Sequence, residues 1–174
     1  MSERNMGVIV GIFFGLCLAV LLLWVCNRKG QIRTQYDERQ KLVRAGGYKI
    51  GFWVITIYEC VLAILGIGEV VIPVEAPVLH FGGIICGITA LGIYSVWKDA
   101  YWGLNNDKRR YTILFVVCGA INLLSGVMSI VDGRIMNDGM VSLPAMNLLC
   151  GLMILVLGIA LGVKSLVSKD AEEE

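Results

Sequence analysis

The sequence predicts an all-α, polytopic integral membrane protein, built as a single bundle of five transmembrane helices. Of its 174 residues, 57% are hydrophobic and 17% are charged, and the mean hydropathy is +0.75. A soluble domain is usually closer to half apolar and a quarter charged. The apolar residues also fall in blocks, each near the length of about 20 helical residues that a bilayer core requires.

Five such blocks are expected as spans, and their boundaries carry the usual error of a few residues. They cover residues 6–26, 49–68, 77–97, 111–131 and 144–166. Residues 27–48 are expected as a loop, either a solvated connector or a short amphipathic helix on the membrane face. Residues 167–174 form a short tail, so residues 1–174 make one transmembrane domain with no room for a soluble one.

The basic residues predict the orientation. Five spans place residues 27–48, residues 98–110 and the tail on one side. Every Lys and Arg lies on that side or at its span ends, except Arg4 and Arg134. The positive-inside rule therefore predicts that the N-terminus is outside and the C-terminus is cytoplasmic.

One carboxylate, Glu59, interrupts the second span within ITIYECVLAIL. It lies midway between Lys49 and Glu69, roughly 15 Å from each end, and a bare carboxylate at that depth is costly. Asn122 lies at a matching depth in the fourth span, with Ser125 on the same helix face, so these side chains are the expected partners. Two interpretations stay open: Glu59 is a protonated interhelical hydrogen-bonding group, or it binds a proton or cation.

His80, the only histidine, is expected about one turn from the outer end of the third span. It is either a polar anchor or an external pH or metal sensor. The sequence has no Ser/His/Asp grouping, P-loop, dinucleotide fingerprint or CxxC motif. We therefore expect no enzyme, no metal and no cofactor, and the near-zero net charge gives no reason to expect a nucleic-acid partner.

Glycines recur at every fourth position in several spans. Such stripes let helix backbones approach closely, either within one chain or between copies in a homo-oligomer. The expected packing glycines are Gly7, Gly11 and Gly15 in the first span and Gly158 and Gly162 in the fifth; Gly83 and Gly87 show the same spacing in the third.

The segment YDERQKLVRAGGYKIGFWV, residues 36–54, places mixed charges just before the second span. It is either a latch that organises the cytoplasmic face, with Asp37 or Glu38 paired to Arg109 or Arg110, or a surface for a cytoplasmic partner. The candidate docking residues are Asp37, Glu38, Arg39, Arg44, Arg109 and Arg110.

The same segment resembles a group of small multi-span membrane proteins of Gram-positive, clostridia-like bacteria that carry a DERQ segment. The matching residues are Asp37, Glu38, Arg39, Gln40, Arg44, Gly47, Tyr48, Lys49 and Phe52. Ala45 and Gly46 stand where that group has a Gly-Lys pair. The resemblance implies a bacterial plasma membrane and, because some members are paired with small helix-turn-helix regulators, a regulatory role.

These observations favour a non-enzymatic regulatory, sensor or accessory subunit that binds a membrane or cytoplasmic protein through its basic loops. The alternative is a small transporter or channel, oligomeric or not, with a midplane polar site made by Glu59 and Asn122. The spans contain few polar residues, which favours the regulatory, sensor or accessory subunit over the transporter or channel.

Overall fold

The computed structural model of the chain describes residues 34–104 and 108–173, and in the first span residues 10, 13–15, 17, 18, 20, 21 and 24. Contacts divide the chain into two units, Met1–Gln35 and Tyr36–Glu174. The described residues between 10 and 24 are helical, and the rest of the predicted span 6–26 lies outside the described residues.

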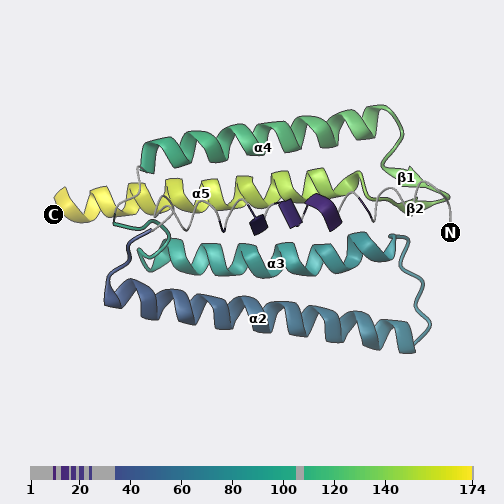
Figure 1. Ribbon diagram of the computed structural model, residues 1–174, viewed down its shortest axis with the longest axis horizontal. Helices are drawn as coiled ribbons and strands as arrows, with labels where there is room; N and C mark the ends of the chain where they lie inside the picture. Colours follow the sequence, from purple (N-terminus) through teal and green to yellow (C-terminus); the bar gives the residue numbers. More distant parts are fainter. Residues whose placement is uncertain are drawn as a thin grey trace. The chain divides into compact units, whose positions relative to one another are not determined.

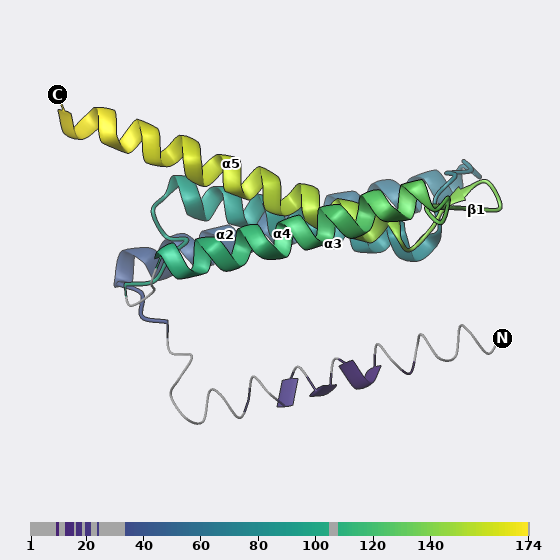
Figure 2. The same ribbon diagram turned by 90° about the horizontal axis from the view of Figure 1, so that it is seen from above.

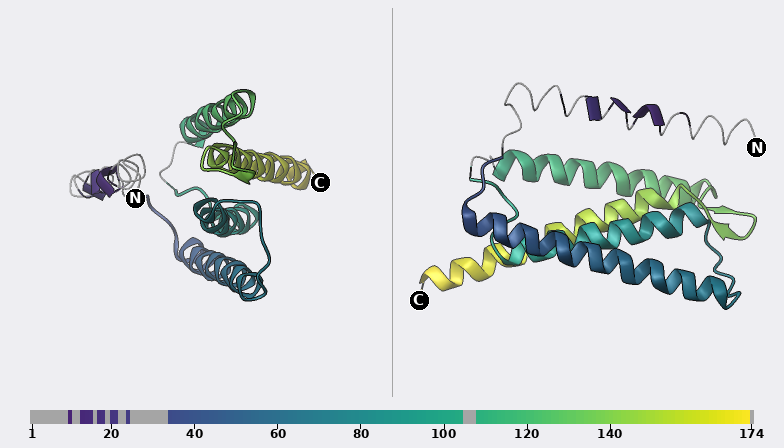
Figure 3. Two further views of the ribbon diagram at one scale, coloured as in Figure 1. Left: turned by 90° about the vertical axis from the view of Figure 1, so that its right-hand side faces the viewer. Right: turned by 60° about the horizontal axis from the view of Figure 1, so that its bottom comes forward.

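Four helices make up the second unit. They are α2 (Glu38–Ile67), α3 (Ala76–Trp97), α4 (Lys108–Val131) and α5 (Ala145–Glu173). Helix α3 packs between α2 and α5, and α4 packs on the far side of α5. The helices therefore lie side by side in the order α2, α3, α5, α4 (Figure 1), which Figure 3 shows end-on.

A row of helices leaves broad apolar faces, and many large hydrophobic side chains on these helices are exposed, such as Ile64, Val116 and Leu124. Among the described residues, three helical segments are long and apolar enough to cross a membrane: Glu38–Ile67, Ala76–Trp97 and Ala145–Ser165. The apolar part of α4, Phe115–Val131, is shorter. The predictions of a mostly helical fold and of helices able to cross a membrane are thus confirmed, whereas the bundle of five spans stays a prediction.

Two helices are longer than predicted. Helix α2 begins at Glu38, so much of the expected loop 27–48 continues the second span as helix. Helix α5 continues as helix to Glu173, through most of the expected tail (Figure 2). The start of α2 has a local cause, the capping residues described below.

Glycines set the close approach of the helices. Gly51 of α2 faces Gly87 of α3, where an added Cβ would lie 3.0 Å from the opposing carbonyl oxygen in either direction. Between α4 and α5, a Cβ at Gly126 would lie 2.6 Å from Leu148, and one at Gly151 would lie 2.6 Å from Leu123. These positions are where the absence of a side chain permits packing.

The glycines expected to pack in the fifth span behave differently. A Cβ added at Gly158 or Gly162 meets nothing within 4 Å, and the same holds for Gly15. Gly7 and Gly11 lie outside the described residues. Among the described residues, Gly158 and Gly162 therefore do not pack closely against another helix of the chain, contrary to that expectation. Gly83 and Gly87 of the third span do pack closely, against α2. Packing of the fifth-span stripe against another copy stays a prediction.

The ends of the row differ in character. At one end, here called the polar end, lie the start of α2, residues 98–104 and Lys164 of α5. At the other, the hairpin end, strands β1 (Met136–Asn137) and β2 (Met140–Val141) form an antiparallel hairpin. Its turn residues, Asp138 and Gly139, both have positive φ, as in the tight turns that suit hairpins.

The hairpin also holds the segment that joins α2 to α3. Val74 pairs with Val141 in a parallel bridge. The amide of Val141 donates to the Pro73 carbonyl at 2.9 Å, and the amide of Glu75 donates to the Val141 carbonyl at 2.8 Å. The connections α2–α3 and α4–α5 thus close the hairpin end together.

Candidate functional site

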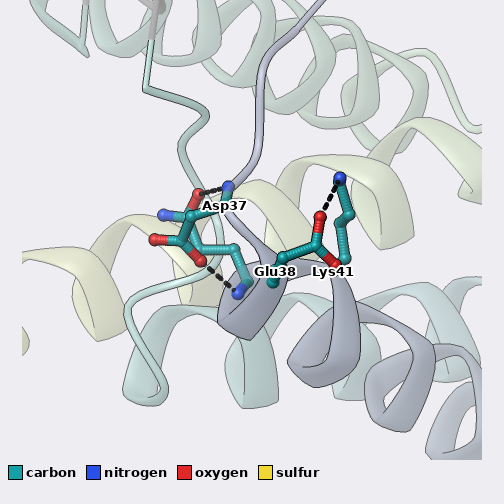
Figure 4. Close-up of polar contacts among 4 residues, drawn as sticks. Asp37, Glu38 and Lys41 are labelled. Atoms are coloured by element: carbon teal, nitrogen blue, oxygen red, sulfur yellow. Dashed lines mark hydrogen bonds and ion pairs between the residues drawn. The ribbon is translucent and has the colours of Figure 1, made fainter.

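The DERQ segment forms a capping box at the start of α2. The Asp37 carboxylate accepts a hydrogen bond from the Gln40 amide at 2.6 Å, and the Gln40 side-chain oxygen accepts one from the Asp37 amide at 3.3 Å. This reciprocal pair satisfies two amides that a helix N-terminus leaves without partners. Figure 4 shows Asp37 in this arrangement, with the ion pair between Glu38 and Lys41 beside it.

Gln40 also connects α2 to the segment that follows α3. Its side-chain nitrogen donates to the Asp99 carbonyl at 3.1 Å and to the Trp102 carbonyl at 3.3 Å. The residue is buried, with 8% of its surface exposed. One side chain therefore caps a helix with its oxygen and holds a distant loop with its nitrogen.

Two arginines strengthen the same contact. Arg39 donates to the Lys98 carbonyl at 3.3 Å, and Arg44 donates to the Ala100 carbonyl at 3.4 Å. The Arg44 guanidinium also lies 4.4 Å from the centre of the Tyr36 ring, in a cation–π contact. We call Asp37, Arg39, Gln40 and Arg44, with residues 98–102, the DERQ latch.

Helix α5 joins the latch through an ion pair. The Lys164 ammonium lies 3.1 Å from a carboxylate oxygen of Asp99, whose backbone has a left-handed φ of 56°. Aspartate tolerates this conformation better than most residues. The carbonyl of Asp99 therefore accepts a hydrogen bond from Gln40 of α2, and its carboxylate pairs with Lys164 of α5.

The predicted docking residues divide between these roles. Asp37 and Arg44 are used within the latch, and Arg39 reaches it from an exposed position. Glu38 instead pairs with Lys41 at 2.7 Å on the exposed side of α2. The expected pairing of Asp37 or Glu38 with Arg109 or Arg110 stays a prediction, because the side chains of Arg109 and Arg110 lie outside the described residues.

A second polar group lies among apolar side chains. The Glu59 carboxylate is 2.9 Å from Nδ1 of His80, joining α2 to α3. Gly83 makes room for this contact, because a Cβ there would lie 3.2 Å from a Glu59 oxygen and 2.6 Å from the Tyr58 ring. Glu59 and His80 are hereafter the Glu59–His80 pair.

The predicted partner of Glu59 was wrong. Asn122 donates to the Cys118 carbonyl within its own helix at 2.8 Å, and Ser125 accepts a hydrogen bond from Asn147 of α5 at 3.2 Å. The physical reason is the order of the row: α3 and α5 lie between α2, which carries Glu59, and α4, which carries Asn122 (Figure 1). The three residues of the expected midplane site, Glu59, Asn122 and Ser125, thus make separate polar contacts.

The pair borders a cavity of about 310 Å³. Its other lining residues are apolar: Leu62, Ala63, Gly66, Val70, Ile72 and Leu79. Among the described residues, no group of three His, Cys, Asp or Glu side chains is arranged to hold a metal ion. The pair can therefore exchange protons and accept hydrogen bonds, but it offers two ligands where a structural metal site usually needs four.

A larger groove of about 1030 Å³ runs along α4 and α5. Its walls are mostly apolar and include Gly158 and Gly162, while Tyr101, Trp102 and Lys164 line it near the polar end. Burial raises the pKa of Tyr101, and the nearby Arg44 charge opposes this only in part, so the phenol stays neutral at physiological pH.

Comparison of the chain with protein-family models, curated proteins and solved structures gave no match. The resemblance to membrane proteins with a DERQ segment therefore stays a prediction. The capping box gives the DERQ letters a physical role that does not depend on that resemblance, because Asp and Gln three residues apart are what the cap requires.

Proposed function

We propose that this chain is a non-enzymatic membrane subunit that works by binding another protein at its polar end. The observation that carries the proposal is the DERQ latch, which joins α2, residues 98–102 and α5 into one surface. Hydrogen bonds to backbone carbonyls hold this surface in a defined shape, which lowers the cost of ordering it on binding. On it, Glu38, Arg39 and Lys41 remain exposed.

In this proposal the chain has five spans, with the polar end in the cytoplasm of a bacterium and the N-terminus outside. Arg39, Arg44, Lys98 and Lys164 gather at the polar end, as the positive-inside rule requires of a cytoplasmic face. Helix α4, with 24 residues, is about 36 Å long and thus reaches across a core of about 30 Å. The apolar run at residues 6–26 supplies the remaining span.

The topology is tested with single cysteines in a variant that lacks the six native ones. We expect a membrane-impermeant maleimide added to intact cells to label Asp138→Cys in the hairpin turn. Glu38→Cys should react only after the membrane is permeabilised. Labelling of Glu38→Cys in intact cells, with Asp138→Cys protected, would show that the orientation is the opposite of the proposed one.

Binding is tested by exchanging two exposed charges. The double variant Glu38→Lys with Lys41→Glu keeps the net charge and an ion pair but reverses the charge pattern on the surface. We expect a protein that copurifies with the wild type in mild detergent to be lost from this variant. A matched control, Lys49→Gln, changes an exposed charge of the same helix away from the latch, and it should retain the partner.

The result that would contradict the proposal is equally clear. If the same proteins copurify with the charge-exchanged variant, or if the wild type yields only copies of itself, the polar end is not the binding surface. The alternative function, a small transporter or channel, would then gain support. It would have to use the Glu59–His80 pair rather than Glu59 with Asn122, because the latter two have separate partners.

A further inference from the structure

The groove between α4 and α5 exists because these two helices diverge toward the polar end. Where they touch, a Cβ added at Gly119 of α4 would lie 2.6 Å from Ile154 of α5. Farther along α5, a Cβ added at Gly158 or Gly162 would meet nothing within 4 Å, and both glycines line the groove. Figure 2 shows α5 turning away from α4 over this stretch. The two glycines therefore border open space instead of a helix contact.

The size of the groove suits one chain of a lipid. Its volume of about 1030 Å³ stands at the upper limit of the range of about 300–1,000 Å³ that is typical of small-molecule sites. Along α5 the lining extends from Gly151 to Ser165, which is about 21 Å of helix at about 1.5 Å per residue. Half of a bilayer core of about 30 Å is about 15 Å. The groove therefore covers the depth of one leaflet, starting from the polar end.

The deeper walls of the groove are hydrocarbon. Phe115, Val116 and Leu123 of α4 line one wall, and Leu155 and Ile159 of α5 line the other. Empty space beside such side chains forfeits dispersion contacts, so an apolar group that fills the space is favoured. An acyl chain is apolar, flexible and long enough to follow α5 along this wall.

The mouth of the groove, at the polar end, has a different lining. Tyr101, Trp102, Lys164 and Ser165 lie there. The rings of Tyr101 and Trp102 contact each other edge to face, with their centres 4.9 Å apart. Tyrosine and tryptophan are enriched where membrane helices reach the level of the lipid headgroups. The mouth therefore has the composition of a headgroup region, and the deeper groove has that of the hydrocarbon.

The charge at the mouth favours an anionic headgroup. Residues 98–110, several of which line the mouth, contain four basic residues and two acidic ones. The Lys164 ammonium has three N–H donors, so it can pair with Asp99 at 3.1 Å and also donate to a bound anion. The Tyr101 phenol, which its raised pKa keeps neutral, supplies a further donor. Basic pockets between membrane helices are typical sites for anionic lipid headgroups.

We propose that the groove between α4 and α5 binds one phospholipid with an anionic headgroup. Its phosphate lies at Lys164 and Tyr101, and one acyl chain follows α5 past Gly158 and Gly162. The proposal shares only the membrane setting with the proposed function, because the exposed charges that are exchanged to test partner binding do not line the groove. The two proposals can therefore fail separately.

Quenching of Trp102 by brominated lipids tests the proposal in a bilayer. The full-length chain carries Trp24→Phe, Trp53→Phe and Trp97→Phe, so that Trp102 is its only tryptophan. It is reconstituted in vesicles that mix phosphatidylcholine with phosphatidylglycerol, and the acyl chains of one lipid at a time carry bromine. We expect phosphatidylglycerol to bind near Trp102 severalfold more tightly than phosphatidylcholine. Equal quenching by the two lipids would overturn the proposal.

Two variants of this reporter separate the headgroup from the acyl chain. Lys164→Gln should lower the preference for phosphatidylglycerol severalfold, whereas Lys49→Gln, an exposed charge of α2, should leave it unchanged. Gly158→Leu fills the groove and should weaken quenching by both lipids. Gly66→Leu is its control, because a Cβ at Gly66 also meets nothing within 4 Å but lies on α2, outside the groove. Unchanged quenching in both Lys164→Gln and Gly158→Leu would overturn the proposal.

A second copy of the chain is the competing occupant of the groove, and it gives a different result. Weak quenching by both lipids, together with a dimer that Gly158→Leu dissociates in light scattering, would overturn the proposal in favour of that copy. The wild-type protein provides a test without substitutions. Offered equal amounts of the two lipids in mild detergent, it should retain more phosphatidylglycerol than phosphatidylcholine in native mass spectra. Equal retention would also overturn the proposal.

Discussion

The side-chain nitrogen of Gln40 donates to the carbonyl of Asp99 at 3.1 Å and so joins residues that are 59 positions apart. The same side chain closes the capping box of α2 with its oxygen. A surface charge, by contrast, could be lost from this region with little effect. The stability of the polar end therefore depends on one buried amide more than on the charges around it.

The first prediction concerns this amide. Gln40→Ala removes the side-chain hydrogen bonds of Gln40 to the Asp37 amide and to the carbonyls of Asp99 and Trp102, which should cost about 1–3 kcal/mol. The free energy of unfolding, measured by denaturant titration in mild detergent, provides the test. Glu38→Ala is the control, since it removes only an exposed ion pair and should cost less than about 0.5 kcal/mol. Equal effects would contradict the central role of Gln40.

A second prediction uses the left-handed backbone of Asp99. Asp99→Asn should cost about 1 kcal/mol or less, because asparagine tolerates positive φ and only the ion pair with Lys164 is lost. Asp99→Val loses the same ion pair and also places a β-branched residue in this conformation, adding about 1–3 kcal/mol. Thermal unfolding in detergent compares the two variants. If they unfold at the same temperature, the backbone conformation of Asp99 carries no strain.

A third prediction compares two glycines. Gly87→Ala places a Cβ 2.4 Å from a side-chain carbon of Ile55 and 3.0 Å from the Gly51 carbonyl oxygen, so α2 and α3 must separate. We expect a loss of about 1–3 kcal/mol, as for other overpacked positions. Gly158→Ala meets nothing within 4 Å and is the matched control, with a neutral or slightly favourable effect.

The same two variants also test the fifth-span stripe. If Gly158→Ala weakens a homo-oligomer while the monomer remains folded, the glycine packs between copies. Light scattering in detergent measures that state directly. A destabilised monomer would contradict the open surroundings of Gly158.

A fourth prediction concerns the hairpin end. The amides of Glu75 and Val141 are hydrogen-bonded across two connections, so their hydrogen exchange should be slow for residues outside helices. Gly139→Val should accelerate both, because valine is strained at a φ of 78°. The exchange of α3 amides serves as the internal control and should be unchanged. Rapid exchange of Glu75 in the wild type would contradict the bridge between the connections.

The sequence predicted the helices better than their partners. The third span was expected at residues 77–97 and is observed at Ala76–Trp97, because Pro77 and a change in polarity mark its ends. The start of α2 was expected eleven residues late at Lys49, although Asp37 and Gln40 have the spacing of a capping box. Hydropathy alone misplaced that boundary, since the polar first turns of α2 lie before the apolar run.

The partner of Glu59 was the larger error. Matching depths suggested Asn122, but depth does not determine which helices are neighbours. The α2–α3 connection is short, and consecutive elements usually lie side by side, which favours His80. The Asp138-Gly139 pair was also a visible signal for the hairpin. The bridge from Val74 to Val141 could not be predicted, because it depends on how the two connections meet.

The order of the helices has a consequence for biosynthesis. Helices α2 and α3 can complete their hydrogen bonds at the polar end, between Gln40 and residues 99–102, before the ribosome has made α5. The bridge from Val74 to Val141 can form only after α4 and the hairpin have been translated. One end of the row thus closes during synthesis, and the other closes only when nearly the whole chain has been inserted. A nascent chain stalled after α3 should therefore already form the hydrogen bonds between Gln40 and residues 99–102, whereas its α2–α3 connection cannot yet pair with Val141.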